Sequence, residues 1–188
     1  MIILGIDPGS RKSGYGVIEV IGKKMRYIDS GVMRYNADLT FLDRIEEIRN
    51  QAQEILINYR PDEIAMESLI YVKSPTALIK LAQARGVILS NFIDTHLGKI
   101  YEYSPNLIKS SSVGHGHADK ESVQKFLHLV FNVDKFATDD ESDALAVAYC
   151  HAIHRGVASM DSYRSVKKIK GGSSLKNALS HKISEGLK

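Results

Sequence analysis

Short apolar runs separated by glycine-containing turns make up residues 1–35. The runs Ile2–Ile6, Gly16–Val20 and Arg26–Tyr35 are joined by connections too short to contain a helix, so they predict three strands in an antiparallel meander. Because the first run is wholly apolar, we expect its strand to be buried in the centre of a sheet. The runs Glu63–Glu67 and Lys99–Tyr103 predict a fourth and a fifth strand.

Apolar positions at helical spacing predict four helices. The first covers residues 39–59 and ends at Arg60-Pro61, and a long second helix begins at Pro75. Two more are expected near Lys120–Val130 and Asp139–His154. Three antiparallel strands followed by alternating helices and strands are typical of an α/β fold, in which helices cover both faces of one five-stranded mixed sheet.

The composition is that of a globular protein with one domain and some additional chain. Of 188 residues, 44% are hydrophobic and 25% are charged, which provides enough apolar material for a core. No apolar stretch approaches the ~20 residues that a membrane span needs, and the N-terminus lacks the layout of a signal peptide. The one cysteine, Cys150, excludes an intrachain disulfide and lies in an apolar helical pattern, so we expect a buried thiol and a cytoplasmic protein.

The chain changes character near residue 155. Residues 156–188 are rich in Ser, Lys and Gly and carry seven basic side chains against two acidic ones, whereas the whole chain has a net charge of only +3. We therefore expect one domain at 1–155 and a flexible basic tail at 156–188. The tail is either an electrostatic arm for nucleic acid, which salt would weaken, or a solvated terminus without a measurable role.

Four carboxylates stand at the ends of predicted core elements. Asp7 ends the first strand, Glu67 ends the fourth, and Asp140 and Asp143 are three apart at the start of the last helix, so they share one helix face. Acids in such places repel one another and are costly to desolvate, for which a divalent cation is the usual compensation. Without a competing Cys/His cluster, oxygen ligands favour Mg²⁺ or Mn²⁺ over Zn²⁺. Two such ions suit phosphodiester cleavage by an activated water.

Each acid taken alone also has a simpler interpretation. Asp7 could be a turn former, Glu67 could end an exposed strand, and the two helical acids could merely favour the helix dipole. Two basic residues of the first turn, Arg11 and Lys12, are either DNA contacts or solvated charges. The joint placement of four acids favours the metal site over these separate interpretations.

Five motifs occur in one order along residues 1–155 and together resemble the RuvC crossover-junction endodeoxyribonucleases. They read Gly5-Ile-Asp-Pro-Gly-Ser-x-x-x-Gly-Tyr-Gly, Ile64-Ala-Met-Glu, Gln83-Ala-Arg-Gly, Val113-Gly-x-Gly-x-Ala-Asp-Lys-Glu and Asp140-Glu-Ser-Asp-Ala-Leu-Ala-Val-Ala. Any one of these motifs is weak evidence, whereas the ordered set is highly specific.

The resemblance implies an RNase H-like fold and a homodimer that resolves four-way (Holliday) DNA junctions by two symmetric nicks, in homologous recombination and DNA repair. It implies two Mg²⁺ ions per site, with Mn²⁺ as a substitute, and the RuvA and RuvB branch-migration proteins as partners. It assigns catalysis and metal binding to four acids and junction binding to two lysines: Asp7, Glu67, Asp140 and Asp143, with Lys109 and Lys120.

Further DNA contacts are expected in two segments. His115 and His117 alternate with Gly114 and Gly116, and two histidines without a third ligand predict a loop that approaches the phosphate backbone rather than a zinc site. After the motif glutamate, family members often carry an aromatic residue that wedges into the junction. Here the matching position is held by an apolar residue with a tyrosine next to it, and either could unstack DNA: Ile70 or Tyr71.

The helix that begins at Pro75 is the candidate dimer interface. A junction has approximate two-fold symmetry, which two identical sites on a symmetric dimer would match. The alternative is that the apolar face of this helix packs on the sheet of its own chain. The face consists of Leu78, Leu81, Ala82, Ala84, Gly86 and Ile88.

Three other functions compete with junction resolution. A sugar kinase or actin-like ATPase also opens with a strand, an aspartate and a glycine-rich turn, but it needs two large lobes, and no Walker-type P-loop follows the turn here. A junction-binding scaffold without nuclease activity is disfavoured by the four acids. A nuclease for RNA or RNA–DNA hybrids is separated from this hypothesis only by the resemblance, because the acids do not specify the sugar.

Overall fold

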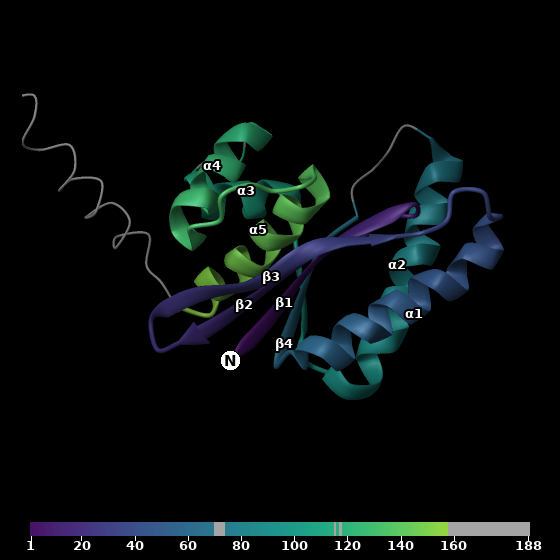
Figure 1. Cartoon of the computed structure of the whole chain (residues 1–188), viewed down its shortest axis with the longest axis horizontal. Helices are drawn as coiled ribbons and strands as arrows, with labels where there is room; N and C mark the ends of the chain where they lie inside the picture. Colours follow the sequence, from purple (N-terminus) through teal and green to yellow (C-terminus); the bar gives the residue numbers. More distant parts are fainter. Residues whose placement is uncertain (70–73, 115, 117, 158–188) are drawn as a thin grey trace, which may run out of the picture. The chain divides into compact units, whose positions relative to one another are not determined.

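A five-stranded mixed sheet with helices on both faces forms the framework of the computed structural model (Figure 1). The structure describes residues 1–69, 74–114, 116 and 118–157. The strand order is β3-β2-β1-β4-β5, with β1, β2 and β3 antiparallel and β4 and β5 added in parallel to β1. The strands are β1 (Ile2–Asp7), β2 (Lys12–Ile21), β3 (Lys24–Arg34), β4 (Glu63–Glu67) and β5 (Ile100–Tyr103). The predicted fold class is confirmed.

The helices form two groups on opposite faces of the sheet. Figure 1 shows α1 (Phe41–Tyr59) and α2 (Pro75–His96) on one side and α3 (Pro105–Val113), α4 (Lys120–Phe131) and α5 (Asp139–His154) on the other. Helix α3 is a correction, because no helix was predicted between the fifth strand and Lys120. The residues that begin and end this helix are nevertheless typical helix boundaries. Ser104 caps its N-terminus, where its hydroxyl accepts from the backbone N–H of Leu107, and Pro105 follows in the first turn. Gly114 ends the helix with φ 91°.

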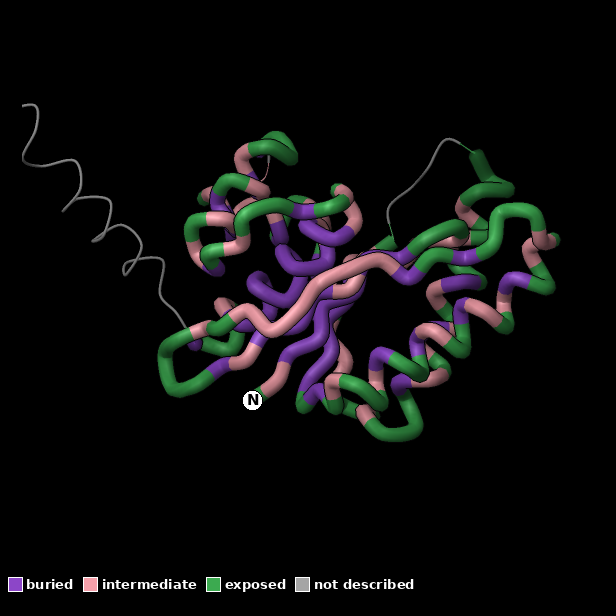
Figure 2. The backbone as a smooth tube through the Cα atoms, in the orientation of Figure 1, coloured by how far each residue is buried: buried purple, intermediate pink, exposed green. Residues whose placement is uncertain are grey.

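Helix α5 is buried along nearly its whole length and lies directly against β1 and β2 (Figure 2). Glycines on the facing strands make this approach possible. A Cβ added to Gly5 would lie 2.2 Å from the carbonyl oxygen of Ala144, and one added to Gly14 would lie 1.9 Å from that of Asp140. Cys150 is fully buried within this helix, and burial raises the pKa of its thiol to about 11, so the predicted buried thiol is confirmed.

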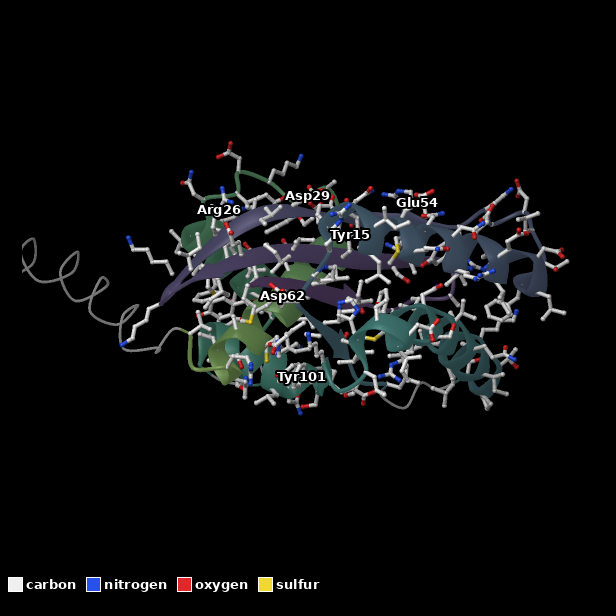
Figure 3. The ribbon with its side chains drawn as sticks, turned by 90° about the horizontal axis from the view of Figure 1, so that it is seen from below. Tyr15, Arg26, Asp29, Glu54, Asp62 and Tyr101 are labelled. Atoms are coloured by element: carbon white, nitrogen blue, oxygen red, sulfur yellow. The ribbon has the colours of Figure 1, made fainter. Side chains whose placement is uncertain are left out.

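The opposite face of the sheet carries the second part of the core. Leu4 and Ile6 of β1 pack there with buried residues of α1 and α2. At the C-terminal end of α1, Tyr59 donates a hydrogen bond to Asp29 on β3. Tyr15 of β2 donates a second one, 3.3 Å long, to the same carboxylate; Tyr15 and Asp29 are labelled in Figure 3. These contacts fix α1 to the edge strand of the sheet.

The long helix α2 has two different faces. Its residues Ala84, Ile88 and Phe92 are fully buried against the core of their own chain. Ala84 and Ile88, two residues of the predicted dimer interface, therefore pack against their own chain, as the alternative interpretation has it. A separate stripe faces outward, in which Ile79 is 58% and Ile93 48% exposed. Ala82 and Gly86 are exposed along the same stripe.

Two further predictions concern the C-terminal tail and the absence of a membrane span. The predicted basic tail lies, from residue 158 onward, outside the described residues, so the boundary at residue 155 stays a prediction. Within the described residues, no helix combines the length and apolar character that crossing a membrane requires.

Candidate active site

Two neighbouring parallel strands place the first two acids side by side. Ile6 of β1 pairs with Met66 of β4, and the next residue of each strand is an acid, Asp7 and Glu67. Side chains alternate along a strand, and Ile6 and Met66 point into the core beside α1 and α2. Asp7 and Glu67 therefore project from the opposite face, which is the face that α5 covers.

The N-terminus of α5 supplies the other two acids. Thr138 caps the helix, its hydroxyl accepting from the backbone N–H of Glu141 at 3.3 Å. Asp140 and Asp143 lie in the first turns, where the helix dipole favours negative charge. Because the glycines of β1 and β2 admit α5 so closely, both carboxylates come near enough to Asp7 to act on its ionisation.

Burial and mutual repulsion make Asp7 and Glu67 harder to ionise. Burial, assisted by the charges of Glu67, Asp143 and Asp140, raises the pKa of Asp7 to about 8. Burial and the charge of Asp143 also raise the pKa of Glu67, although its hydrogen bond with Asp7 acts in the other direction. Asp7 and Glu67 thus share a hydrogen bond and hold a proton at a pH at which exposed carboxyls have lost theirs. Excess negative charge of this kind is the condition that a divalent cation relieves.

Two lysines neutralise the helical acids. Lys120, the first residue of α4, places its Nζ 2.8 Å from Oδ2 of Asp143 and 3.8 Å from Oδ2 of Asp139. Burial opposes its charge, but the Asp143 partner prevails and raises the pKa of Lys120. On the other side, Lys12 forms an ion pair with Asp140. Asp140 and Asp143 therefore each have a lysine ammonium group beside them.

The donor set suits an oxygen-preferring metal, although it is not arranged as a finished coordination sphere. Among the described residues, no three Asp, Glu, His or Cys side chains are grouped closely enough to hold an ion. The donors available are carboxylates only, which fits Mg²⁺ or Mn²⁺ rather than Zn²⁺. Burial and neighbouring negative charge raise the pKa values of Asp7 and Glu67, and lysines pair with Asp140 and Asp143, so all four carboxylates are in surroundings that favour a nearby cation.

A cavity of about 210 Å³ opens beside the acids. Two acids and two lysines form its polar wall, and the lysines come from α3 and α4. The lining residues are Glu67, Asp143, Lys109 and Lys120 with Pro105, Ile108, Val123 and Ala146. The two lysines that the resemblance singles out therefore share one cavity with two of the four acids.

The turn between β1 and β2 is held by residues that the sequence analysis missed. The Ser13 hydroxyl accepts from the backbone N–H of Gly9 at 3.0 Å and from the Tyr35 hydroxyl at 2.9 Å. Arg44 of α1 is 8% exposed and donates to four backbone carbonyls, among them that of Ser10 at 3.1 Å. The Tyr35 hydroxyl lies 22 residues from Ser13 and the Ser10 carbonyl 34 residues from Arg44, so these roles become visible only once the fold is known.

Two further predicted DNA contacts, Gly114 and Gly116, lie at the end of α3 and beside its residue Asn106. Gly114 ends α3, and Gly116 lies against Asn106, where an added Cβ would be 3.1 Å from the Asn106 carbonyl oxygen. Both wedge candidates, Ile70 and Tyr71, lie outside the described residues, as do His115 and His117. The glycines thus belong to the α3 region rather than to the acid cluster.

Comparisons with known proteins agree with this geometry. The family model described as "Crossover junction endodeoxyribonuclease RuvC" matches residues 3–151. A protein of that name from Geobacter sp. (strain M21) is 39% identical over 160 residues, which cover 85% of this chain and 97% of the relative. One from Rhizobium leguminosarum bv. trifolii (strain WSM2304) is 36% identical over 155 residues, or 82% of this chain and 90% of the relative.

Solved structures give the same result for the fold. RuvC of T. thermophilus in complex with a Holliday junction substrate matches with a TM-score of 0.75 and 29% identity, covering 85% of this chain and 98% of that one. The yeast mitochondrial Holliday junction resolvase Ydc2 matches with a TM-score of 0.59 and 16% identity, covering 88% of this chain and 84% of that one. At that identity the second match concerns the fold alone.

Proposed function

This chain belongs to the RuvC family of crossover junction endodeoxyribonucleases, and we propose that it is a Mg²⁺-dependent cytoplasmic enzyme that resolves four-way DNA junctions by paired, symmetric nicks. The observation that carries the proposal is the acid cluster beside a lysine-lined cavity. Four carboxylates come together from β1, β4 and α5, and burial, assisted by the charges of the other three, raises the pKa of Asp7 to about 8. The activity belongs to homologous recombination and DNA repair.

The chain's own residues divide the work at the site. Asp7, Glu67, Asp140 and Asp143 would hold two Mg²⁺ ions, for which Mn²⁺ can substitute. When bound, Mg²⁺ promotes attack by water on the phosphodiester and stabilises the leaving oxygen. From the wall of the cavity, Lys109 and Lys120 attract the phosphate backbone and balance its charge. These six residues comprise the whole polar wall of the cavity together with Asp7 and Asp140.

Other contacts position the junction. We place Gly114 and Gly116 near the phosphate backbone, because a segment without Cβ atoms admits it closely. Either Ile70 or Tyr71 serves as the wedge that unstacks a base step. The basic residues after position 156 would add affinity that falls with salt concentration.

The exposed stripe of α2 is the proposed homodimer interface. Ile79 and Ile93 are large apolar residues that the chain leaves about half exposed. Gly86 lies between them in mid-helix, where a glycine costs ~1 kcal/mol relative to alanine, and nothing lies within 4 Å of a Cβ added there. A small residue with open space above it suits close packing against a second helix. RuvA and RuvB are the expected further partners.

A dimerisation test follows from that open space. Gly86→Arg should block close approach of a second helix while leaving the fold of the monomer intact. Light scattering after size-exclusion chromatography should show a dimer for the wild type and a monomer for the variant. A dimeric Gly86→Arg protein would place the interface elsewhere.

The function itself is tested by a cleavage assay on three substrates. A four-way junction, a linear duplex of the same sequence and an RNA–DNA hybrid are compared in Mg²⁺ and in EDTA. We expect cutting of the junction alone, in Mg²⁺ alone. Tight junction binding without cutting would indicate the scaffold function, and cutting of the hybrid alone would indicate an RNA-directed nuclease.

A further inference from the structure

A positively charged side chain already occupies the neighbourhood of one metal-binding acid. Lys12 forms an ion pair with Asp140 across 128 positions of sequence. The Asp140 side chain is only 21% exposed, whereas that of Lys12 is 47% exposed. The lysine therefore covers a largely enclosed carboxylate from the solvent side.

The backbone that carries Lys12 is firmly held. Lys12 is the first residue of β2 and pairs with Arg34 of β3. The turn before it is so tight that a Cβ on Gly9 would lie 2.0 Å from the carbonyl oxygen of Lys12. Ser13, the next residue, is fully buried and accepts from the Gly9 N–H. The position of the Lys12 Cα is thus set by the fold, and only the flexible stem of the side chain is free to move.

Two lysines pair with the two metal-binding acids of α5. Lys120, at the start of α4, pairs with Asp143, and Lys12, at the start of β2, pairs with Asp140. The two other acids, Asp7 and Glu67, instead share a hydrogen bond. Without Lys12, Asp140 would face the other carboxylates without a cation of its own.

We propose that Lys12 is a resident cation that competes with divalent metal for Asp140 and thereby sets the metal affinity of the site. This inference rests on the proposed function, which makes Asp140 a metal ligand. A divalent ion that binds Asp140 must displace the Lys12 ammonium group from this carboxylate. Because the Lys12 backbone is fixed, the displaced ammonium group stays close to the ion. Repulsion between a single and a double charge about 5 Å apart, even with the dielectric constant of water, corresponds to roughly a tenfold loss of affinity.

Metal titration of the DNA-free protein tests the proposal. Mn²⁺ binding to the full chain is measured by isothermal calorimetry for the wild type, Lys12→Met and Lys12→Arg. Lys12→Met keeps the stem and removes the charge, so it should bind Mn²⁺ about tenfold more tightly. Lys12→Arg keeps the charge and should remain near the wild-type affinity. Lys125→Met is the matched control, since Lys125 pairs with Glu121 on the exposed surface of α4.

A second readout guards against a variant that folds poorly. Binding to the folded state raises the melting temperature, so Mg²⁺ should raise that of Lys12→Met more than that of the wild type. Lys12→Gln provides a second neutral variant, and circular dichroism verifies the fold of both. Unchanged or weaker Mn²⁺ binding in the neutral variants would overturn the role of Lys12 while leaving the metal site intact. A wild-type protein that binds neither ion would overturn the metal assignment itself, and this proposal with it.

Discussion

Replacing Gly14 by alanine should disable the active site through the backbone. The added Cβ would lie 1.9 Å from the carbonyl oxygen of Asp140, whereas real Cβ contacts essentially never fall below 3.0 Å. The obstacle is backbone, so β2 and the N-terminus of α5 must separate by about 1 Å or more. Overpacking of this kind costs ~1–3 kcal/mol of stability, and a ~1 Å misplacement of a catalytic group lowers the rate about 100-fold.

The assay must separate a misplaced acid from a damaged fold. Single-turnover cleavage of a four-way junction gives the rate, gel-shift binding gives the affinity, and urea denaturation gives the free energy of unfolding. Gly31→Ala is the control, because its Cβ would meet the hydroxyl of the Tyr15 side chain at 2.7 Å, on the face away from α5. We expect nearly wild-type cleavage from this control. A Gly14→Ala enzyme that folds and cuts at the wild-type rate would refute the argument that close approach of α5 positions Asp140.

Three further perturbations probe the site and its support. Asp143→Asn nearly preserves shape while removing ligand charge, so gel shifts should show retained junction binding and cleavage should fall by at least ~100-fold; equal loss of binding would contradict the assignment. Arg44→Met should lower the free energy of unfolding by about 3 kcal/mol in urea, since four backbone carbonyls lose a charged donor; an unchanged midpoint would contradict this. Burial lowers the pKa of His151 from 6.5, so the folded state binds fewer protons and its stability should fall as pH drops through 6.5. His151→Gln should lose that part of the pH dependence of the melting temperature, and a pH profile identical to that of the wild type would show that another group titrates.

Much of the fold could be predicted because local pattern and tertiary structure agree. The run Glu63–Glu67 and the helix Asp139–His154 were predicted with the bounds they have in the structure. The strand has an apolar interior and the helix an apolar run from Ala144 to Cys150, so burial reinforces the local signal. The second strand was predicted too short, from Gly16, because Lys12–Tyr15 is polar and glycine-rich and extends only through its pairing with β1 and β3.

Helix α3 was missed for a different reason. Its Ser110-Ser-Ser run has low helix propensity and hides the apolar period, while the stabilising contacts come from α5 and α4. Its three serines are accommodated by bonds within the helix, such as that from the Ser111 hydroxyl to the Leu107 carbonyl at 2.8 Å. Tertiary packing overrides a weak local preference here, and sequence patterns carry little of that information.

The candidate site was predictable in its acids and less so in their surroundings. Acids at the ends of buried elements are conspicuous, because such positions are normally apolar. The ion pair of Lys12 with Asp140 joins residues 128 apart, and an exposed lysine in a turn has no distinguishing pattern. The same holds for the outward stripe of α2, since the burial of Ala84 and Ile88 decides which face remains free.

Mapping of nicks on each strand of a mobile four-way junction tests directly whether this chain resolves junctions. Each of the four strands is labelled in turn, and the products formed in Mg²⁺ and in EDTA are sized and then treated with ligase. We expect two Mg²⁺-dependent cuts at symmetric positions on strands of like polarity, with ends that ligase reseals. Cuts on one strand only, or equal cutting of the linear duplex, would contradict it.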